Sequence, residues 1–89
     1  MSSTIYSYYT QKVMFYSIKK EVIMYVEILL KSVRLKKNIT LNTLSKMTGI
    51  STTHLNDIEN NIKSPGFCIM VTLSKALNVD ISELYSVHY

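Results

Sequence analysis

Short polar side chains crowd a stretch between residues 52 and 57, and they supply most of the chemistry that this sequence offers. The members are Thr52, Thr53, His54, Asn56 and Asp57. Hydroxyl, amide, imidazole and carboxylate groups donate and accept hydrogen bonds in defined directions. Such a set suits recognition by hydrogen bonding if one element presents all five side chains together. The plainer alternative is the solvated polar face of a helix.

The sequence has few residues that could form a catalytic or metal-binding site. His54, His88 and Cys68 do not stand at any of the usual metal-ligand spacings. The sequence also has no glycine-rich phosphate loop and no nucleophile motif. We therefore expect no enzyme activity, no metal site and no cofactor, and we expect Cys68 to be an inert, half-buried thiol.

The size and composition of the chain limit what it can be. Its 89 residues suffice for one domain, its net charge of +4 is mildly basic, and its single cysteine suits a reducing cytosol. The apolar run over residues 13–30 is interrupted by Lys19, Lys20, Glu21 and Glu27. It is therefore too short for a membrane-spanning helix, and no secretory signal is evident. We expect a cytoplasmic protein without a membrane role.

The N-terminal third of the chain is the hardest part to assign. Residues 1–12 predict a loose arm, whereas residues 13–18 fit either a short strand or an early helical turn. From Met24 onward, apolar residues recur at helical spacing up to a basic end near Lys37, which predicts a first helix. We expect an extension over residues 1–23, flexible or serving as a dimer arm, and a compact domain over residues 24–89.

Two capped helices joined by a short turn follow. Thr40 can cap a helix that runs to Lys46 or Met47, and Gly49 supplies the left-handed residue that ends it. Ser51 can then cap a second helix over residues 52–60, with Leu55 and Ile58 on its inner side. The turn has room for only three or four residues, so the helices must cross steeply. This arrangement is typical of a helix-turn-helix.

Two further helices complete the prediction. Asn60 and Asn61 can both take the left-handed conformation at a helix end. A helix is expected over residues 67–77, and a last short one after Asp80, which forms a capping pair with Glu83. The fold class is therefore all-α, a compact five-helix domain with an N-terminal arm or short strand.

These residues resemble the lambda-repressor-like helix-turn-helix family, the Cro/repressor or XRE type of bacterial and phage regulators. The resemblance covers residues 30–84 through LLKSVRLKKNITLNTLSKMTGISTTHLNDIENNIKSP and MVTLSKALNVDISELY. Its landmarks are Arg34, Leu44, Ser45, Gly49, Ile50, Leu55, Ile58, Glu59, Pro65, Ala76 and Leu77. Each landmark is weak alone, and the set is specific.

The resemblance implies DNA as the partner and assigns roles to particular residues. Residues 52, 53 and 57 fall where relatives contact bases, with His54 and Asn56 beside them. Thr suits a thymine methyl or a base acceptor, Asn56 suits adenine, and Asp57 can accept from cytosine. Phosphate contacts are expected at Thr40, Lys46, Ser51, Asn60 and Lys63. Arg34 and Glu59 are expected to form a partly buried structural ion pair.

Some positions depart from the family pattern. Leu41 stands where relatives usually have a phosphate-clamping glutamine, and Asn61 replaces a glycine. Weak DNA contacts per subunit would make dimerisation important. Relatives are often polar at three positions that are apolar here, which are Ile62, Cys68 and Ile69. These residues are a candidate dimer face. The alternative for the two isoleucines is an ordinary place in the core.

Three functions remain open on this basis. The first is a transcriptional regulator, a repressor, that binds a palindromic operator as a homodimer. The second is an antitoxin of the same fold that holds a toxin through residues 1–23, an antirepressor being another possible protein partner. The third is a protein-interaction module that has lost DNA binding.

Overall fold

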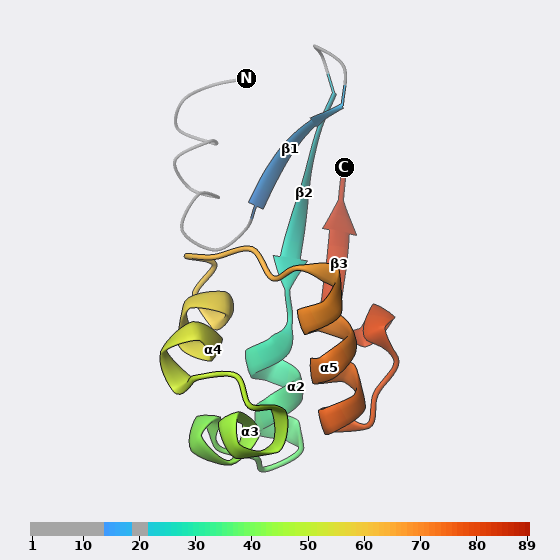
Figure 1. Cartoon of the computed structure of the whole chain (residues 1–89). Helices are drawn as coiled ribbons and strands as arrows, with labels where there is room; N and C mark the ends of the chain where they lie inside the picture. The colour runs from blue at the N-terminus through green and yellow to red at the C-terminus, as the bar shows by residue number, and fades with distance from the viewer. Residues whose placement is uncertain (1–13, 19–21) are drawn as a thin grey trace.

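A computed structural model describes residues 14–18 and 22–89 of the chain. Its elements are, in order, β1 (Met14–Ile18), β2 (Val22–Ile28), α2 (Leu30–Lys36), α3 (Leu41–Thr48), α4 (Thr52–Glu59), α5 (Phe67–Leu77), the 3-10 helix η1 (Ile81–Leu84) and β3 (Tyr85–His88). The helices gather at one end of the molecule, and the strands project from it (Figure 1). The arm expected at residues 1–12 lies outside the described residues.

The core lies among the four α-helices and is built from apolar residues at helical spacing. Leu44, Leu55, Ile58 and Leu73 are completely buried, and each comes from the inner face of its helix. Leu30, Met70, Leu77 and Leu84 complete this cluster. Because apolar burial is the main favourable term in folding, this cluster holds α4 in place while leaving its outer face to solvent.

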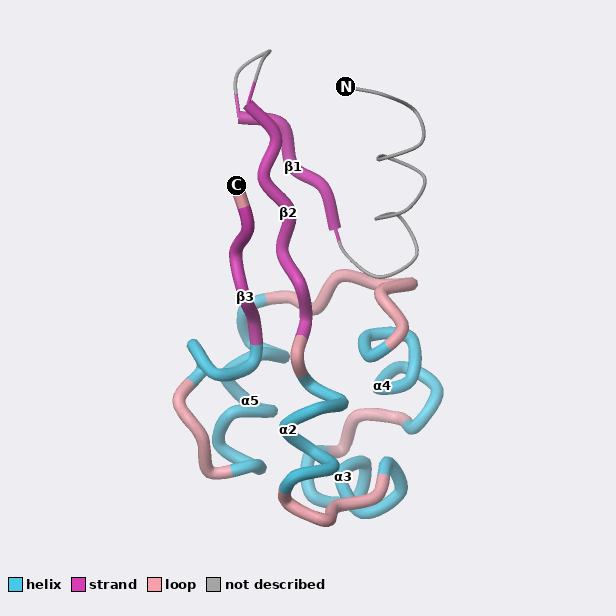
Figure 2. The backbone as a smooth tube through the Cα atoms, turned by 180° about the vertical axis from the view of Figure 1, so that it is seen from behind, coloured by secondary structure: helices cyan, strands magenta, loops and turns pink. Residues whose placement is uncertain are grey.

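A small antiparallel sheet stands beside the helices. The strand order is β1-β2-β3, so β2 is central and pairs with a neighbour on each side (Figure 2). Val26 lies opposite Val87, and Ile28 lies opposite Tyr85, in the pairing of β2 with β3. The N–H of Leu29 donates to the carbonyl of Leu84 at 2.8 Å, which continues the ladder to the start of α2. The sheet therefore joins the two ends of the helical region.

The prediction of a helix from Met24 is wrong for its first six residues. Residues 24–28 belong to strand β2, and α2 begins only at Leu30. Short apolar runs do not separate strand from helix by periodicity alone. Here strand β3, far along the chain, supplies the hydrogen-bond partners that make the extended form stable. Of the two alternatives for residues 13–18, the structure has the strand, at Met14–Ile18.

The expected fifth α-helix is replaced by a 3-10 turn. The predicted capping arrangement is confirmed, because Asp80 Oδ1 accepts from the Ser82 N–H at 3.0 Å and Glu83 Oε2 accepts from the Asp80 N–H at 2.9 Å. The bonds from Ser82 lower the pKa of the Asp80 carboxyl. The chain then leaves η1 directly as strand β3. Over the described residues the fold is mostly helical, with four α-helices and a small sheet, and the expected count of five helices is not confirmed.

Candidate nucleic-acid interface

Hydrogen bonds at the end of α3 hold the start of the turn between α3 and α4. Gly49 ends α3 in the left-handed conformation with φ 77°, and its N–H donates to the carbonyl of Ser45 at 2.8 Å. The Thr48 hydroxyl donates to the carbonyl of Leu44 at 2.8 Å and accepts from the N–H of Ile50 at 3.1 Å. The relative position of the two helices is therefore set by local contacts as well as by the core.

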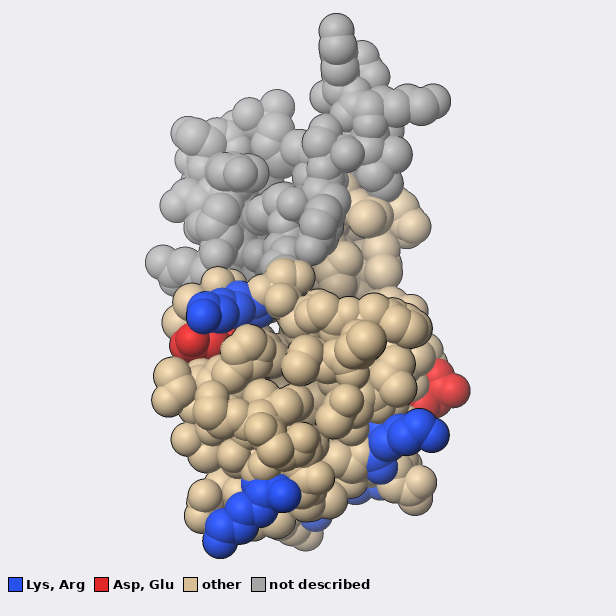
Figure 3. Space-filling model, in the orientation of Figure 1, with Lys and Arg blue, Asp and Glu red and all other residues tan. Residues whose placement is uncertain are grey.

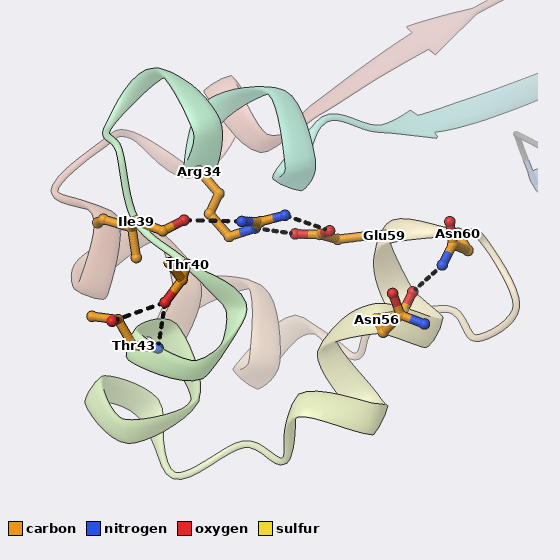
Figure 4. Close-up of polar contacts among 7 residues, drawn as sticks. All are labelled: Arg34, Ile39, Thr40, Thr43, Asn56, Glu59 and Asn60. Atoms are coloured by element: carbon orange, nitrogen blue, oxygen red, sulfur yellow. Dashed lines mark hydrogen bonds and ion pairs between the residues drawn. The ribbon is translucent and has the colours of Figure 1, made fainter.

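Both helices of the pair carry the predicted N-caps. Thr40 Oγ1 accepts from the N–H of Thr43 at 3.1 Å (Figure 4). Ser51 Oγ accepts from the N–H of His54 at 3.1 Å. A side-chain cap satisfies only part of the first turn of a helix. In the described structure, the first two amides of each helix, at residues 41 and 42 and at residues 52 and 53, have no acceptor in the protein. They are available to an anion.

Helix α4 has one buried face and one polar face. Leu55 and Ile58 are fully buried, whereas Thr52, Thr53 and Asn56 are exposed. His54 and Asp57 are half-buried. Since residues four apart lie on the same side of a helix, 52 and 56, like 53 and 57, share the outer face. The structure thus brings four of the five predicted residues together, with His54 at their side.

The predicted phosphate-contacting residues are accessible to solvent. Thr40, Lys46, Ser51, Asn60 and Lys63 are all exposed. The hydroxyls of Thr40 and Ser51 serve as caps, and Asn60 Nδ2 donates to the carbonyl of Asn56 at 3.0 Å (Figure 4). Those three side chains therefore have structural partners, and the two lysines carry the positive charge.

A buried ion pair holds the end of α4 against α2. Arg34 Nε donates to Glu59 Oε2 at 2.6 Å, and Arg34 Nη2 donates to Glu59 Oε1 at 3.1 Å (Figure 4). Arg34 Nη1 donates to the carbonyl of Ile39 at 2.9 Å. The hydrogen bonds to Glu59 raise the pKa of Arg34, although its burial opposes this. The two side chains are only 9% and 3% exposed, so the pair is structural and is not presented to a ligand.

Charge is sparse on the surface that Figure 3 shows. Lys and Arg side chains form separate patches, two of which adjoin acidic residues, and uncharged surface lies between them. In addition, Asp57 brings a carboxylate to the α4 face itself. The face in this view therefore has no large positive patch that would attract a polyanion over a long range.

Several predictions at the helix ends need correction. Cys68 is exposed and not half-buried. Ile69 packs against the core, whereas Ile62 is 68% exposed. Asn61 is left-handed with φ 59°, as expected, but Asn60 is not, at φ −95°. Of the two alternatives for the isoleucines, Ile69 thus has the core role, and Ile62 does not.

One exposed side chain of the interface was not singled out from the sequence. Asn42 is exposed in the first turn of α3, next to the open amides of that helix. Its position in the sequence, two residues after the Thr40 cap, could have indicated that it lies in the exposed first turn of this helix. In residues 14–18 and 22–89, no group of three or more His, Cys, Asp or Glu side chains could hold a metal ion.

Comparisons with known proteins agree with this geometry. A family model described as helix-turn-helix matches residues 30–84. The clp gene regulator ClgR from C. glutamicum has a similar structure, with a TM-score of 0.59 and 24% identity over 61% of this chain and 70% of that one. The restriction-modification controller protein C.AhdI from Aeromonas hydrophila also has a TM-score of 0.59, with 20% identity over 61% of this chain and 82% of its own. At these identities the likeness shows the fold alone.

The other findings are negative. No curated protein sequence matches the chain significantly. None of the described helices has both the length and the apolar character needed to cross a membrane.

Proposed function

Because the chain belongs to the helix-turn-helix family through residues 30–84, we propose that it is a DNA-binding transcription regulator. The observation that carries the proposal is the outer face of α4. Thr52, Thr53 and Asn56 are exposed there, beside open backbone amides and above a rigid turn. This is the arrangement that a recognition helix needs at its N-terminal end.

In the proposed complex, α4 enters the major groove of double-stranded DNA. Thr52 and Thr53 lie at the N-terminal end, where they meet base edges and thymine methyl groups. Asn56, one turn later, has the paired donor and acceptor that match adenine, and Asp57 accepts from cytosine. His54 lies at the side of the face and contacts the groove wall.

Phosphates on either side fix the register of the domain. The open amides at residues 41, 42, 52 and 53 bind phosphate oxygens, and the hydroxyls that cap these helices lie beside them. Lys46 and Lys63 contribute charge. Because these contacts do not depend on base identity, they supply affinity but not sequence preference.

The regulator acts as a homodimer on a palindromic operator. Two recognition helices reach successive major grooves when the half-sites are about one helical turn apart. Two copies also double the positive charge that is presented to the DNA. Occupation of such an operator blocks the promoter that contains it, which makes repression the proposed outcome.

The test separates base readout from phosphate binding. We expect the triple variant Thr52→Ala, Thr53→Ala, Asn56→Ala to lose at least tenfold in preference for the upstream region of its own gene over unrelated DNA, because each lost base contact is worth about 1–3 kcal/mol. Weak, salt-dependent binding should remain. Titration of labelled DNA fragments across a salt series measures both.

A matched control removes two exposed hydroxyls far from α4. Ser32→Ala with Thr72→Ala changes exposed residues of α2 and α5 and should leave the preference intact. If the unmodified protein binds all DNA equally at every salt concentration, the operator proposal fails.

A further inference from the structure

Strand β3 leaves one edge of the sheet open. In the described part of the chain it is hydrogen-bonded to β2 alone, and the strand order places it last. Its outer row of backbone N–H and C=O groups is therefore available for pairing. Proteins usually protect such an edge with lysine, proline or a bulge. Residues 85–88 read Tyr-Ser-Val-His and contain no lysine and no proline, so the shortness of this four-residue strand is its main protection.

The same edge carries an apolar face. Val87 lies opposite Val26, and Tyr85 lies opposite Ile28, so these four side chains share one face of the sheet. Val87 is 38% exposed, Tyr85 37% and the following Tyr89 87%. For apolar and aromatic residues on a four-residue strand, this exposure indicates an uncovered surface.

A groove runs along this face and continues onto α5. It has a volume of about 360 Å³ and is lined by Tyr85 and Val87, by their partners on β2, and by Pro65, Phe67 and Met70. Phe67, at the start of α5, is 75% exposed. Among the residues that the structure describes, no Lys, Arg, Asp or Glu lines the groove. It therefore fits an apolar occupant.

We propose that a second copy of the chain covers this edge, with the two β3 strands paired antiparallel about a two-fold axis at Val87. This inference rests on the proposed function, because it identifies the interface of the proposed dimer. The two sheets then form one continuous sheet across the axis. The interface is isologous, with the same residues contributed by each copy.

The faces of the strand limit the register to those in which the apolar residues of the two copies lie opposite one another. Residues directly opposite each other in a sheet point to the same side, and a slip of one residue reverses every side chain. With Val87 opposite Val87, Tyr85 lies opposite Tyr89, and the apolar faces of the two copies join. Each Tyr89 then lies beside the groove of the other copy, which has no other apolar occupant among the described residues.

The opposite face of the strand is equally compatible with a second copy. Ser86 lies opposite His88 in this register, so no like charges meet. His88 is already held by Glu27, at 3.2 Å from Nε2 to Oε1, and stacks on Tyr25 with ring centres 4.6 Å apart. The strand therefore matches its own copy on both faces, apolar on one and polar on the other, which favours a second copy over an unrelated chain.

Cysteine crosslinking tests the register directly. In a Cys68→Ser background, V87C places two thiols opposite each other, where Cα atoms about 4.5–5.5 Å apart suit a disulfide. The matched variant S86C places its thiols on the other face, at a Cα separation of roughly 8 Å, too far for a bridge. We expect mild oxidation to crosslink V87C nearly completely and S86C hardly at all.

A charge at the centre of the interface tests its energetics without DNA. V87K brings two lysines face to face, and we expect the dimer dissociation constant in sedimentation equilibrium to rise at least tenfold. Leu35→Lys is the matched control, since Leu35 is 55% exposed on α2, away from the sheet. Circular dichroism checks that each variant is folded. If V87K does not fold, the nearly isosteric V87C still tests the inference.

Each other outcome has a definite meaning. A monomer at all concentrations, or a dimer that V87K does not weaken and V87C does not crosslink, overturns this inference and leaves DNA binding to its own test. Equal crosslinking of V87C and S86C overturns the register. If the unmodified chain is monomeric and binds a different protein through this edge, the second copy is the wrong occupant.

Discussion

Two acid–base pairs link distant parts of the described chain, and they lie in very different surroundings. Arg34 and Glu59 join α2 to α4 through two hydrogen bonds, and their side chains are 9% and 3% exposed. His88 and Glu27 join β3 to β2 through one contact of 3.2 Å, and their side chains are 39% and 45% exposed. The first pair belongs to the helical core and the second to the projecting sheet.

The difference in exposure between the two pairs suggests different roles for the helical region and the sheet. A buried charge that loses its partner is strongly destabilising, whereas an exposed pair contributes little. The helical region thus keeps α4 in one position, as DNA recognition requires. The sheet is held by backbone pairing and a few exposed side chains, which leaves its edge available to a partner.

The largest effect is expected from removing the buried carboxylate. Glu59→Ala leaves Arg34 buried with only the carbonyl of Ile39 as acceptor, and should lower the free energy of unfolding by about 3–5 kcal/mol. Chemical denaturation measures the change. As a control, replacing both partners with apolar residues, Arg34→Met with Glu59→Leu, should recover most of the loss. If Glu59→Ala costs less than about 1 kcal/mol, the two pairs do not differ as proposed.

A smaller effect is expected from the turn before α4. Gly49 has φ 77°, and nothing lies within 4 Å of the Cβ that a larger residue would add, so any penalty is backbone strain alone. Gly49→Val should cost about 1–2 kcal/mol, measured by thermal unfolding.

Gly66 provides the matched glycine. It also has open space around its Cβ position but an ordinary φ of −72° at the N-cap of α5. Gly66→Ser should change stability by only a few tenths of a kcal/mol. Equal losses at the two glycines would show that the turn is not conformationally demanding.

The smallest effect is expected from the exposed pair of the sheet. Glu27→Gln removes one charge but keeps a hydrogen-bond acceptor, so the free energy of unfolding should fall by less than about 1 kcal/mol. The loss should shrink further in high salt, because exposed charges are screened. A loss as large as that of Glu59→Ala would mean that the sheet is as tightly integrated as the helical core.

Much of the helical region could be predicted because its signals are local. Thr40, Ser51 and Asp80 each accept a hydrogen bond from a residue two or three positions later. Gly49 and Asn61 take left-handed conformations that few other residues tolerate. A short stretch of sequence contains all the atoms of such an interaction. The types and the spacing of its residues are therefore sufficient to predict it.

The sheet could not be predicted in the same way. Residues 24–28 have an apolar pattern that suits either helix or strand, and the choice depends on the partner at residues 85–88. The exposure of Cys68 and the separation of Ile62 from Ile69 likewise depend on how α5 docks on the core.

The sequence by itself determined the helix-turn-helix, its caps, its turn and the polar residues of α4, because these depend on contacts between near neighbours and on periodic burial. Only the tertiary structure decided that β2 and β3 meet, that one edge of the sheet stays open, and that Arg34 reaches Glu59 with so little exposure. Those features depend on bringing distant segments together, and the free energy that decides them belongs to the assembled fold and not to any single stretch of the chain.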